Sequence, residues 1–119
     1  MLRWDAIILA GGRAVRLSGI DKCGLVVRGR TLLDAAIAAT EGAGSCVIVG
    51  PQREGLPGRV RSVVDEPPYS GTPYAVERGL AALAGSRSDL VAVVAADQPR
   101  ADDALAAVLS QVRPSSEAE

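Results

Sequence analysis

A glycine-rich loop with three basic side chains follows the first apolar stretch of the chain. In the segment IILAGGRAVRLSGIDK, Gly11 and Gly12 stand directly after the apolar residues. Glycine lets a ligand approach the backbone closely, and backbone N–H groups in such a loop bind anions. The basic side chains of the same loop are Arg13, Arg16 and Lys22. The segment therefore predicts an anion site, and the number of cations favours a polyphosphate.

The spacing of this loop differs from two well-known phosphate-binding loops. A dinucleotide fingerprint needs GxGxxG, whereas the chain reads GGRAVRLSG. A Walker A loop needs GxxxxGK[ST], whereas Lys22 lies between Asp21 and Cys23. Neither a Rossmann dehydrogenase nor a P-loop NTPase is supported. On the glycine pair alone, an ordinary strand-to-helix turn with solvated charges is the alternative.

The sequence contains no histidine, which removes the most common general base and the Ser/His/Asp arrangement. Cys23 and Cys46 have no CxxC spacing and no histidine to join them, so we expect reduced thiols and no zinc site. Any catalysis must then use carboxylates, Lys, Arg, backbone amides or a metal ion.

Length and charge restrict the class of protein. A chain of 119 residues with 48% hydrophobic residues forms one domain, which we place at residues 1–112, with a disordered tail at 113–119. The net charge of −1 gives no field that would attract nucleic acid or an anionic membrane. No apolar run approaches the roughly 20 residues that cross a bilayer, and no signal pattern begins the chain, so we expect a soluble cytoplasmic protein.

Four short segments are predicted to be strands. Apolar runs without alternation cover residues 6–10, 46–49 and 90–96, and a weaker, alternating run covers 60–64. Such runs are typical of strands that are covered on both faces, as in parallel α/β sheets.

Three segments between and after these strands are predicted to be helices. Thr31 and Asp34 have the spacing of a capping box before an alanine-rich helix that ends near Gly42. Thr72 is expected to cap a second helix, in which Gly79 either weakens the helix or allows close packing. In that second helix, the residues expected to share one face are Val76, Leu80 and Leu83. The third helix, residues 101–112, has the expected apolar stripe Leu105, Val108, Leu109 and Val112.

The order of these elements predicts a three-layer α/β/α sandwich with right-handed crossovers and a mostly parallel sheet. Ligands in such sheets bind beyond the carboxyl ends of the strands. Asp5 and Asp89 lie at strand beginnings, away from that edge, and are interpreted as solvated. Asp102 and Asp103 are interpreted as helix-dipole partners. The arginines Arg53, Arg59 and Arg61 are interpreted as a solvated loop cluster, with an acceptor-phosphate site as the alternative.

Several motifs in sequence order resemble one family. LAGG at residues 9–12 is followed by Arg-Leu at 16–17, Asp-Lys at 21–22 and GRTLL at 29–33. The segments 64–66, 71–73 and 96–99 resemble the family's acidic segment, its G-P-L turn and its C-D-x-P motif. This series is similar to the signature of the MobA-like NTP transferases, whose best-known member is the molybdenum cofactor guanylyltransferase. The resemblance implies a Rossmann-like, nucleotide-diphospho-sugar transferase-like fold.

The resemblance also implies roles for individual residues. The backbone of Leu9, Ala10 and Gly11 would contact the nucleotide, with Gly12 completing the loop. Lys22 would lie on the phosphates and act with Arg16 on the reacting groups, while Arg13 would help to bind the nucleotide. Asp97 would hold Mg²⁺, and Asp65 would contact the nucleotide, with Glu66 as the alternative.

The implied reaction needs no strong general base. A substrate phosphate attacks the α-phosphate of a nucleoside triphosphate, and that phosphate is already ionised at neutral pH because its second pKa is about 6. The reaction needs in-line positioning and positive charge from Mg²⁺ and from Lys or Arg. The expected partners are GTP or CTP and molybdopterin or another phosphorylated acceptor.

Three other interpretations remain at this point. The chain could transfer CMP to molybdopterin or a nucleotide to a sugar phosphate. It could be a short relative that binds a nucleotide or a partner without catalysis. It could also be a general phosphate-binding α/β module with an accidental resemblance.

Full members of the family continue for roughly another half-length beyond the region that matches here. The resemblance places the acceptor pocket and a second metal-binding acidic segment in that continuation. We therefore expect nucleotide binding with little or no transfer by this chain. We also expect an uncovered strand edge or helix face that favours self-association as a homo-oligomer.

The substitution Lys22→Ala is expected to weaken triphosphate binding and to leave the fold intact. A loop lysine contributes little to a hydrophobic core, but its charge-assisted contact to a phosphate is worth about 1.5 to 3 kcal/mol. Titration calorimetry with GTP and CTP measures the effect. Equal affinity of the variant and the parent would remove Lys22 from the site.

Overall fold

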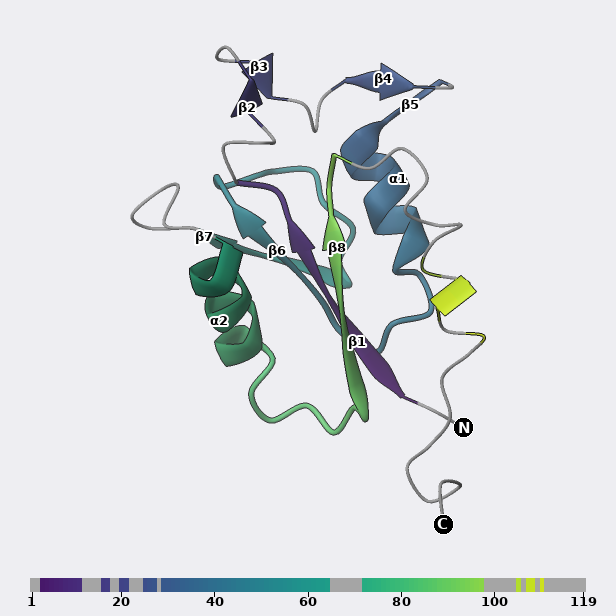
Figure 1. The fold of residues 1–119 in the computed structure, drawn as a ribbon, viewed down its shortest axis with the longest axis vertical. Coiled ribbons are helices and arrows are strands. Elements are labelled where there is room, and N and C mark those ends of the chain that lie inside the picture. The colour runs from purple at the N-terminus through teal and green to yellow at the C-terminus, as the bar shows by residue number, and fades with distance from the viewer. Residues whose placement is uncertain are drawn as a thin grey trace.

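A four-stranded parallel sheet forms the centre of the molecule (Figure 1). The computed structural model describes residues 3–11, 16–17, 20–21, 25–27, 29–64, 72–97, 105, 107–108 and 110. The strands are β1 (Trp4–Leu9), β6 (Cys46–Gly50), β7 (Val60–Val64) and β8 (Leu90–Ala95). Their order is β7-β6-β1-β8, and all three pairs are parallel. All four predicted strands are therefore confirmed.

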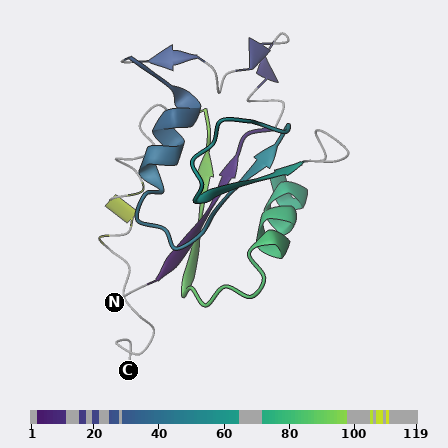
Figure 2. The same ribbon diagram turned by 180° about the vertical axis from the view of Figure 1, so that it is seen from behind.

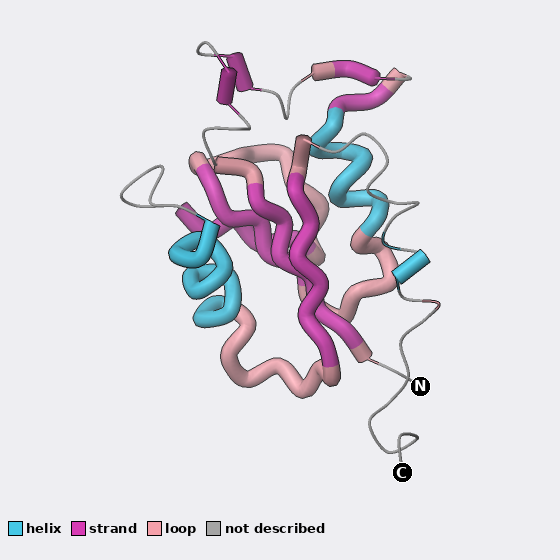
Figure 3. The backbone as a smooth tube through the Cα atoms, viewed as in Figure 1, coloured by secondary structure: helices cyan, strands magenta, loops and turns pink. Residues whose placement is uncertain are grey.

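Two small antiparallel pairs interrupt the connection between β1 and the first helix. They are β2 (Arg16–Leu17) with β3 (Ile20–Asp21), and β4 (Val26–Val27) with β5 (Arg30–Thr31). Figure 3 shows both pairs beyond the ends toward which the sheet strands run. The sequence predicted a loop here, because strands of two residues leave no periodicity to detect.

Helices cover both faces of the sheet, as Figures 1 and 2 show from opposite sides. The helix α1 (Leu32–Ala39) places Ala36 and Ile37 in one core cluster with Ile8 and Ile48. The helix α2 (Thr72–Ala82) lies on the other face, where Ile7, Val47 and Leu83 form the second cluster. Because successive strand residues point to opposite faces, both sets of side chains must be apolar. The predicted three-layer sandwich is confirmed.

The first helix begins at the predicted cap and ends earlier than predicted. Thr31 Oγ1 accepts a hydrogen bond from Asp34 N at 3.0 Å. At the other end, Arg59 donates to the carbonyl oxygens of Ile37 at 2.7 Å and Thr40 at 3.0 Å. A guanidinium group at the carboxyl end of a helix opposes the negative end of the helix dipole. Arg59 thus binds the end of this helix, and it stays exposed to solvent as the sequence suggested.

The second helix packs closely on β1 through a glycine. A Cβ atom on Gly79 would lie 2.8 Å from both Cδ1 and Cγ2 of Ile7. Of the two predicted roles of Gly79, close packing is the one that the structure shows. The predicted face of this helix was wrong at Leu80, which is 46% exposed, whereas Leu83 is buried. The helix already includes Thr72, so the expected N-cap position was also wrong by one residue.

The structure describes a small part of the predicted third helix. Residues 105, 107 and 108 are helical, and Leu105 is buried in the same core cluster as Ala36 and Ile37 of α1. Val108 is 59% exposed, so its assignment to the apolar stripe was wrong. Leu109, Val112, Asp102, Asp103 and the tail 113–119 lie outside the described residues. Across the described ranges, no helix has the length and apolar character needed to cross a bilayer.

The outer strand β8 leaves apolar surface uncovered. Val91 and Val93 are 40% and 47% exposed, whereas Val94, on the opposite face of the strand, is buried. The helix α2 packs on β6 and β1 and does not cover these two valines. Self-association through this edge stays a prediction.

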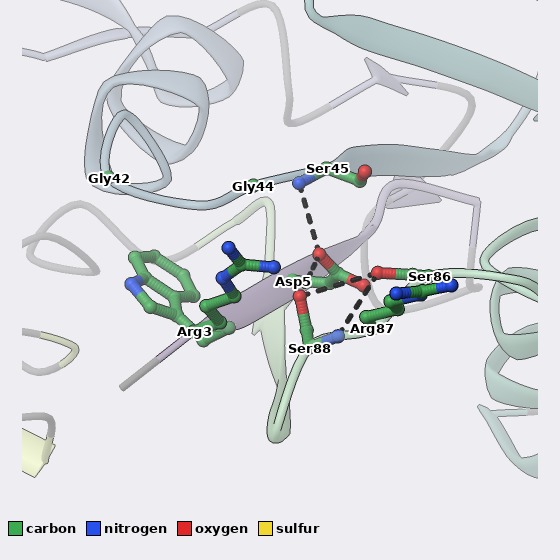
Figure 4. Close-up of a pocket in the computed structure, with 9 residues that line it drawn as sticks. Arg3, Asp5, Gly42, Gly44, Ser45, Ser86, Arg87 and Ser88 are labelled. Carbon is green, nitrogen blue, oxygen red and sulfur yellow. Dashed lines mark hydrogen bonds between the residues drawn. The ribbon is translucent and has the colours of Figure 1, made fainter. Parts of the chain in front are cut away.

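Asp5 is buried, although the sequence suggested that it is solvated. Its side chain accepts hydrogen bonds from Ser88 Oγ at 2.7 Å and Ser45 N at 3.1 Å, as the dashed lines in Figure 4 show. The turn before β6 and the loop before β8 close over the amino end of β1, which local sequence does not reveal. Asp89 is exposed, as predicted, and accepts a hydrogen bond from Arg3 N at 3.0 Å.

The substitution Gly79→Ala is expected to destabilise the protein. Alanine favours a helix interior by about 1 kcal/mol, but forcing its methyl group against the rigid branch of Ile7 costs up to about 3 kcal/mol. We expect a net loss on the order of 1 kcal/mol in the free energy of unfolding, measured by urea denaturation. Gly58→Ala is the control, because no atom lies within 4 Å of its added Cβ. A more stable Gly79→Ala protein would contradict the packing argument.

Candidate functional site

The carboxyl ends of three strands meet at one edge of the sheet (Figure 1). The ladder continues one residue past the strands, because Ala10 N donates to Val49 O at 2.9 Å and Ala96 N donates to Leu9 O at 3.0 Å. These bonds fix the start of the glycine-rich loop between the ends of β6 and β8. Asp97 follows directly after Ala96.

Four of the predicted site residues are therefore described at this edge. Leu9, Ala10 and Gly11 continue from β1, and Asp97 follows β8. Gly12, Arg13, Lys22 and Asp65 lie outside the described residues, as does Glu66. For Arg16 the structure gives the backbone, which pairs with Asp21 in the β2–β3 hairpin. The roles of these residues stay predictions.

Gly50 ends β6 with its backbone against the glycine-rich loop. A Cβ atom at this position would lie 2.8 Å from the carbonyl carbon of Ala10 and 3.0 Å from Gly11 N. Both contacts are to backbone, which cannot move away as a flexible side-chain end can. The loop therefore lies directly on the end of β6, and no larger residue fits at Gly50.

Arg53 contacts the same loop from the connection between β6 and β7. Its guanidinium Nη2 donates to Ala10 O at 3.2 Å, and the side chain is half-buried. The sequence suggested a solvated cluster of Arg53, Arg59 and Arg61. Arg59 and Arg61 are exposed, as predicted, whereas Arg53 is half-buried. All three side chains donate to backbone carbonyls, with Ala82 O as the acceptor for Arg61. These contacts join residues 19 to 43 positions apart, so no local signal predicted them.

Asp97 has the donor chemistry of a magnesium ligand. Within the described part of the chain, no group of three His, Cys, Asp or Glu side chains could together hold a metal. Mg²⁺ is commonly held by one or two carboxylates together with substrate phosphates and water, and it does not need an all-protein cage. A half-buried carboxylate beside a predicted phosphate loop fits that pattern.

Cys46 is a buried thiol and takes no part in this edge. It is free, and Thr40 Oγ1 donates a hydrogen bond to its sulfur at 3.4 Å. Burial raises the pKa of Cys46 above its ordinary value of 9.0, outweighing the lowering effects of that bond and of Arg59. The thiol therefore stays protonated at neutral pH. Cys23 lies outside the described residues.

A cavity of about 340 Å³ lies at the opposite, amino-terminal end of the sheet (Figure 4). It is lined by Arg3, Trp4, Asp5, Ser45, Arg87 and Ser88, among others. The Asp5 carboxylate already accepts two hydrogen bonds from the surrounding turns. We interpret the Asp5 carboxylate as a structural link between these turns and do not assign a ligand to the cavity, because ligands of parallel α/β sheets bind at the other end of the sheet.

Comparison with known sequences agrees with this placement. Residues 6–119 match the family described as the MobA-like NTP transferase domain. The chain belongs to the MobA-like NTP transferase family. This MobA-like chain is 57% identical over 37 residues to the molybdenum cofactor guanylyltransferase of Acidiphilium cryptum, covering 31% of this chain and 19% of the relative. It is 37% identical over 103 residues to the bifunctional protein GlmU of Xanthobacter autotrophicus, covering 78% of this chain and 23% of the relative.

A solved structure shares the fold. The crystal structure of Rv0371c from Mycobacterium tuberculosis H37Rv superposes with a TM-score of 0.66 at 22% sequence identity. The match covers 91% of the MobA-like chain and 60% of the solved chain. For each of the two curated relatives, the region matched by the MobA-like chain covers less than a quarter of the relative's length.

The substitution Gly50→Ala is expected to displace the glycine-rich loop. Its methyl group would have to push backbone atoms away, which costs about 1 to 3 kcal/mol of stability and moves the loop amides. Melting temperature and binding of GTP and CTP should both fall. Gly44→Ala is the matched control at the other end of the sheet, where the nearest atom to an added Cβ is 3.5 Å away. Unchanged nucleotide affinity in Gly50→Ala would show that this contact does not shape the site.

Proposed function

We propose that this protein is a Mg²⁺-dependent nucleotidyltransferase that moves a nucleoside monophosphate from GTP to molybdopterin. The observation that carries the proposal is the meeting of the Leu9–Gly11 backbone and Asp97 at the carboxyl edge of a parallel sheet. Membership of the MobA-like family supports the general reaction class. The partial match to a guanylyltransferase supports GTP and molybdopterin in particular.

In this proposal, the protein positions two phosphates and stabilises negative charge. The backbone amides of the loop hold the donor triphosphate, and Asp65 contacts the nucleotide, with Glu66 as the alternative. Arg13, Arg16 and Lys22 oppose the charge that develops as the acceptor phosphate attacks the α-phosphate and pyrophosphate leaves. Bound Mg²⁺, held by Asp97, would supply further positive charge.

No residue has to remove a proton from the acceptor. A phosphate monoester is largely a dianion at neutral pH, because its second pKa is about 6. The absence of histidine from the chain is therefore consistent with this reaction.

Two observations favour other candidates. The match to the bifunctional protein GlmU covers more of the chain than the match to the guanylyltransferase, so a phosphorylated acceptor other than molybdopterin is the alternative. The predicted site residues that the structure describes are those to which the resemblance gives nucleotide or metal contacts, which favours a relative that binds nucleotide without transfer. CTP is the alternative donor.

A thermal-shift panel with GTP, CTP, ATP and UTP, each with and without Mg²⁺, tests the site, the metal and the base together. A ligand at 100 times its Kd stabilises the folded state by about 2.7 kcal/mol, which is a readily measured shift. Pyrophosphate release that depends on molybdopterin would distinguish transfer from binding alone. No stabilisation by any of the four nucleotides would overturn the proposal.

The substitution Asp97→Asn is expected to abolish most of the Mg²⁺ dependence of nucleotide binding. A neutral amide is a much poorer ligand for a hard cation than a carboxylate. Titrations with and without Mg²⁺ measure the effect. Asp89→Asn is the matched control, because Asp89 immediately precedes the amino end of the strand that Asp97 follows. If Mg²⁺ still changed the nucleotide affinity of Asp97→Asn as it does in the parent, Asp97 would not be the ligand.

A further inference from the structure

The connection between β6 and β7 contacts one peptide unit of the glycine-rich loop from two positions. The backbone at Gly50 packs against the carbonyl carbon of Ala10 and the nitrogen of Gly11. Arg53 Nη2 donates to the oxygen of the same peptide at 3.2 Å. Packing and hydrogen bonding thus hold the Ala10–Gly11 peptide in one orientation.

The orientation of this peptide determines where the Gly11 N–H points. A peptide unit is planar and trans, so its C=O and N–H groups point in opposite directions. Because the oxygen of Ala10 faces Arg53, the N–H of Gly11 faces away from it. Gly11 is buried, and no described residue accepts a hydrogen bond from its N–H. Buried backbone N–H groups are almost always paired, and a phosphate oxygen is a suitable acceptor.

Arg53 differs from the two other arginines that bind backbone carbonyls nearby. Arg59 donates to Ile37 and Thr40 at the end of α1, and Arg61 donates to Ala82, the last residue of α2. Both therefore bind carbonyls at the end of a helix, where the dipole is negative. The Ala10 carbonyl that Arg53 binds belongs to no helix and lies at the carboxyl edge of the sheet. Helix capping accounts for the contacts of Arg59 and Arg61 and does not account for the contact of Arg53 with Ala10.

We propose that Arg53 is a positioning residue for the donor triphosphate. It holds the Ala10 carbonyl so that the Gly11 N–H points toward a phosphate oxygen. Its positive charge also polarises the shared peptide, which makes the N–H a stronger donor. The triphosphate does not have to touch Arg53 for this effect. The inference rests on the proposed nucleotide site and adds a residue from outside the loop to it.

The test compares Arg53→Ala, Arg53→Lys and Arg59→Ala with the parent. Calorimetry with Mg²⁺-GTP, Mg²⁺-CTP and inorganic tripolyphosphate measures affinity, and melting without ligand measures stability. Arg53→Ala should lower the affinity for each of the three ligands about tenfold or more, since a hydrogen bond to a charged group contributes a factor of that order to a binding constant. Arg53→Lys keeps a cationic donor and should recover part of the affinity. Arg59→Ala should lower the melting temperature while the folded protein keeps the parent affinity.

A second readout needs no ligand. The amide resonance of Gly11 in a proton–nitrogen NMR spectrum should move upfield in Arg53→Ala and less in Arg53→Lys, because the peptide loses its polarising donor. A purely structural role for Arg53 would lower stability without this local change.

The outcomes separate this inference from the proposed function. If the parent binds triphosphates and Arg53→Ala binds them equally well, Arg53 has no positioning role and the nucleotide site stands. An unchanged Gly11 resonance in Arg53→Ala would also overturn the inference. If the parent binds neither nucleotide nor tripolyphosphate, the proposed function fails and this inference fails with it.

Discussion

The burial of β1 on every side is the constraint on which the rest of the structure depends. Ala6, Ile7 and Ile8 are fully buried, because β6 and β8 flank the strand and a helical layer covers each face. A strand in this position needs apolar residues throughout and parallel neighbours linked by long connections. Parallel neighbours end at the same edge of the sheet. The glycine-rich loop and Asp97 therefore meet there as a consequence of the core.

Small residues determine how closely the layers approach one another. The chain has 3% aromatic residues, so its core is filled by aliphatic side chains that must interlock at short range. Gly79 lets α2 lie against Ile7, and Gly50 lets the loop lie against the end of β6. In both places the two segments can approach this closely only because glycine has no side chain. The first contact joins a helix to the sheet, and the second shapes the candidate site.

Three arginines around β7 connect the layers to that site. Arg59 binds the end of α1, Arg61 binds the end of α2 and Arg53 binds the glycine-rich loop. Each guanidinium group donates to backbone carbonyls, whose dipoles oppose its positive charge. The segment from Arg53 to Arg61 thereby links both helical layers and the glycine-rich loop.

The sequence by itself determined the features whose causes are local. Apolar runs predicted the four strands, the spacing of Thr31 and Asp34 predicted the first helix cap, and ordered motifs predicted the family. Because parallel strands end at a common edge, the same runs predicted a ligand site at that edge, where the structure brings Leu9–Gly11 and Asp97 together. Features that depend on distant residues were missed, because no periodicity records them. Asp5 is enclosed by two turns, and Arg53 reaches a carbonyl 43 positions away. The tertiary structure decided these contacts because burial and hydrogen bonding depend on what the fold brings next to a residue.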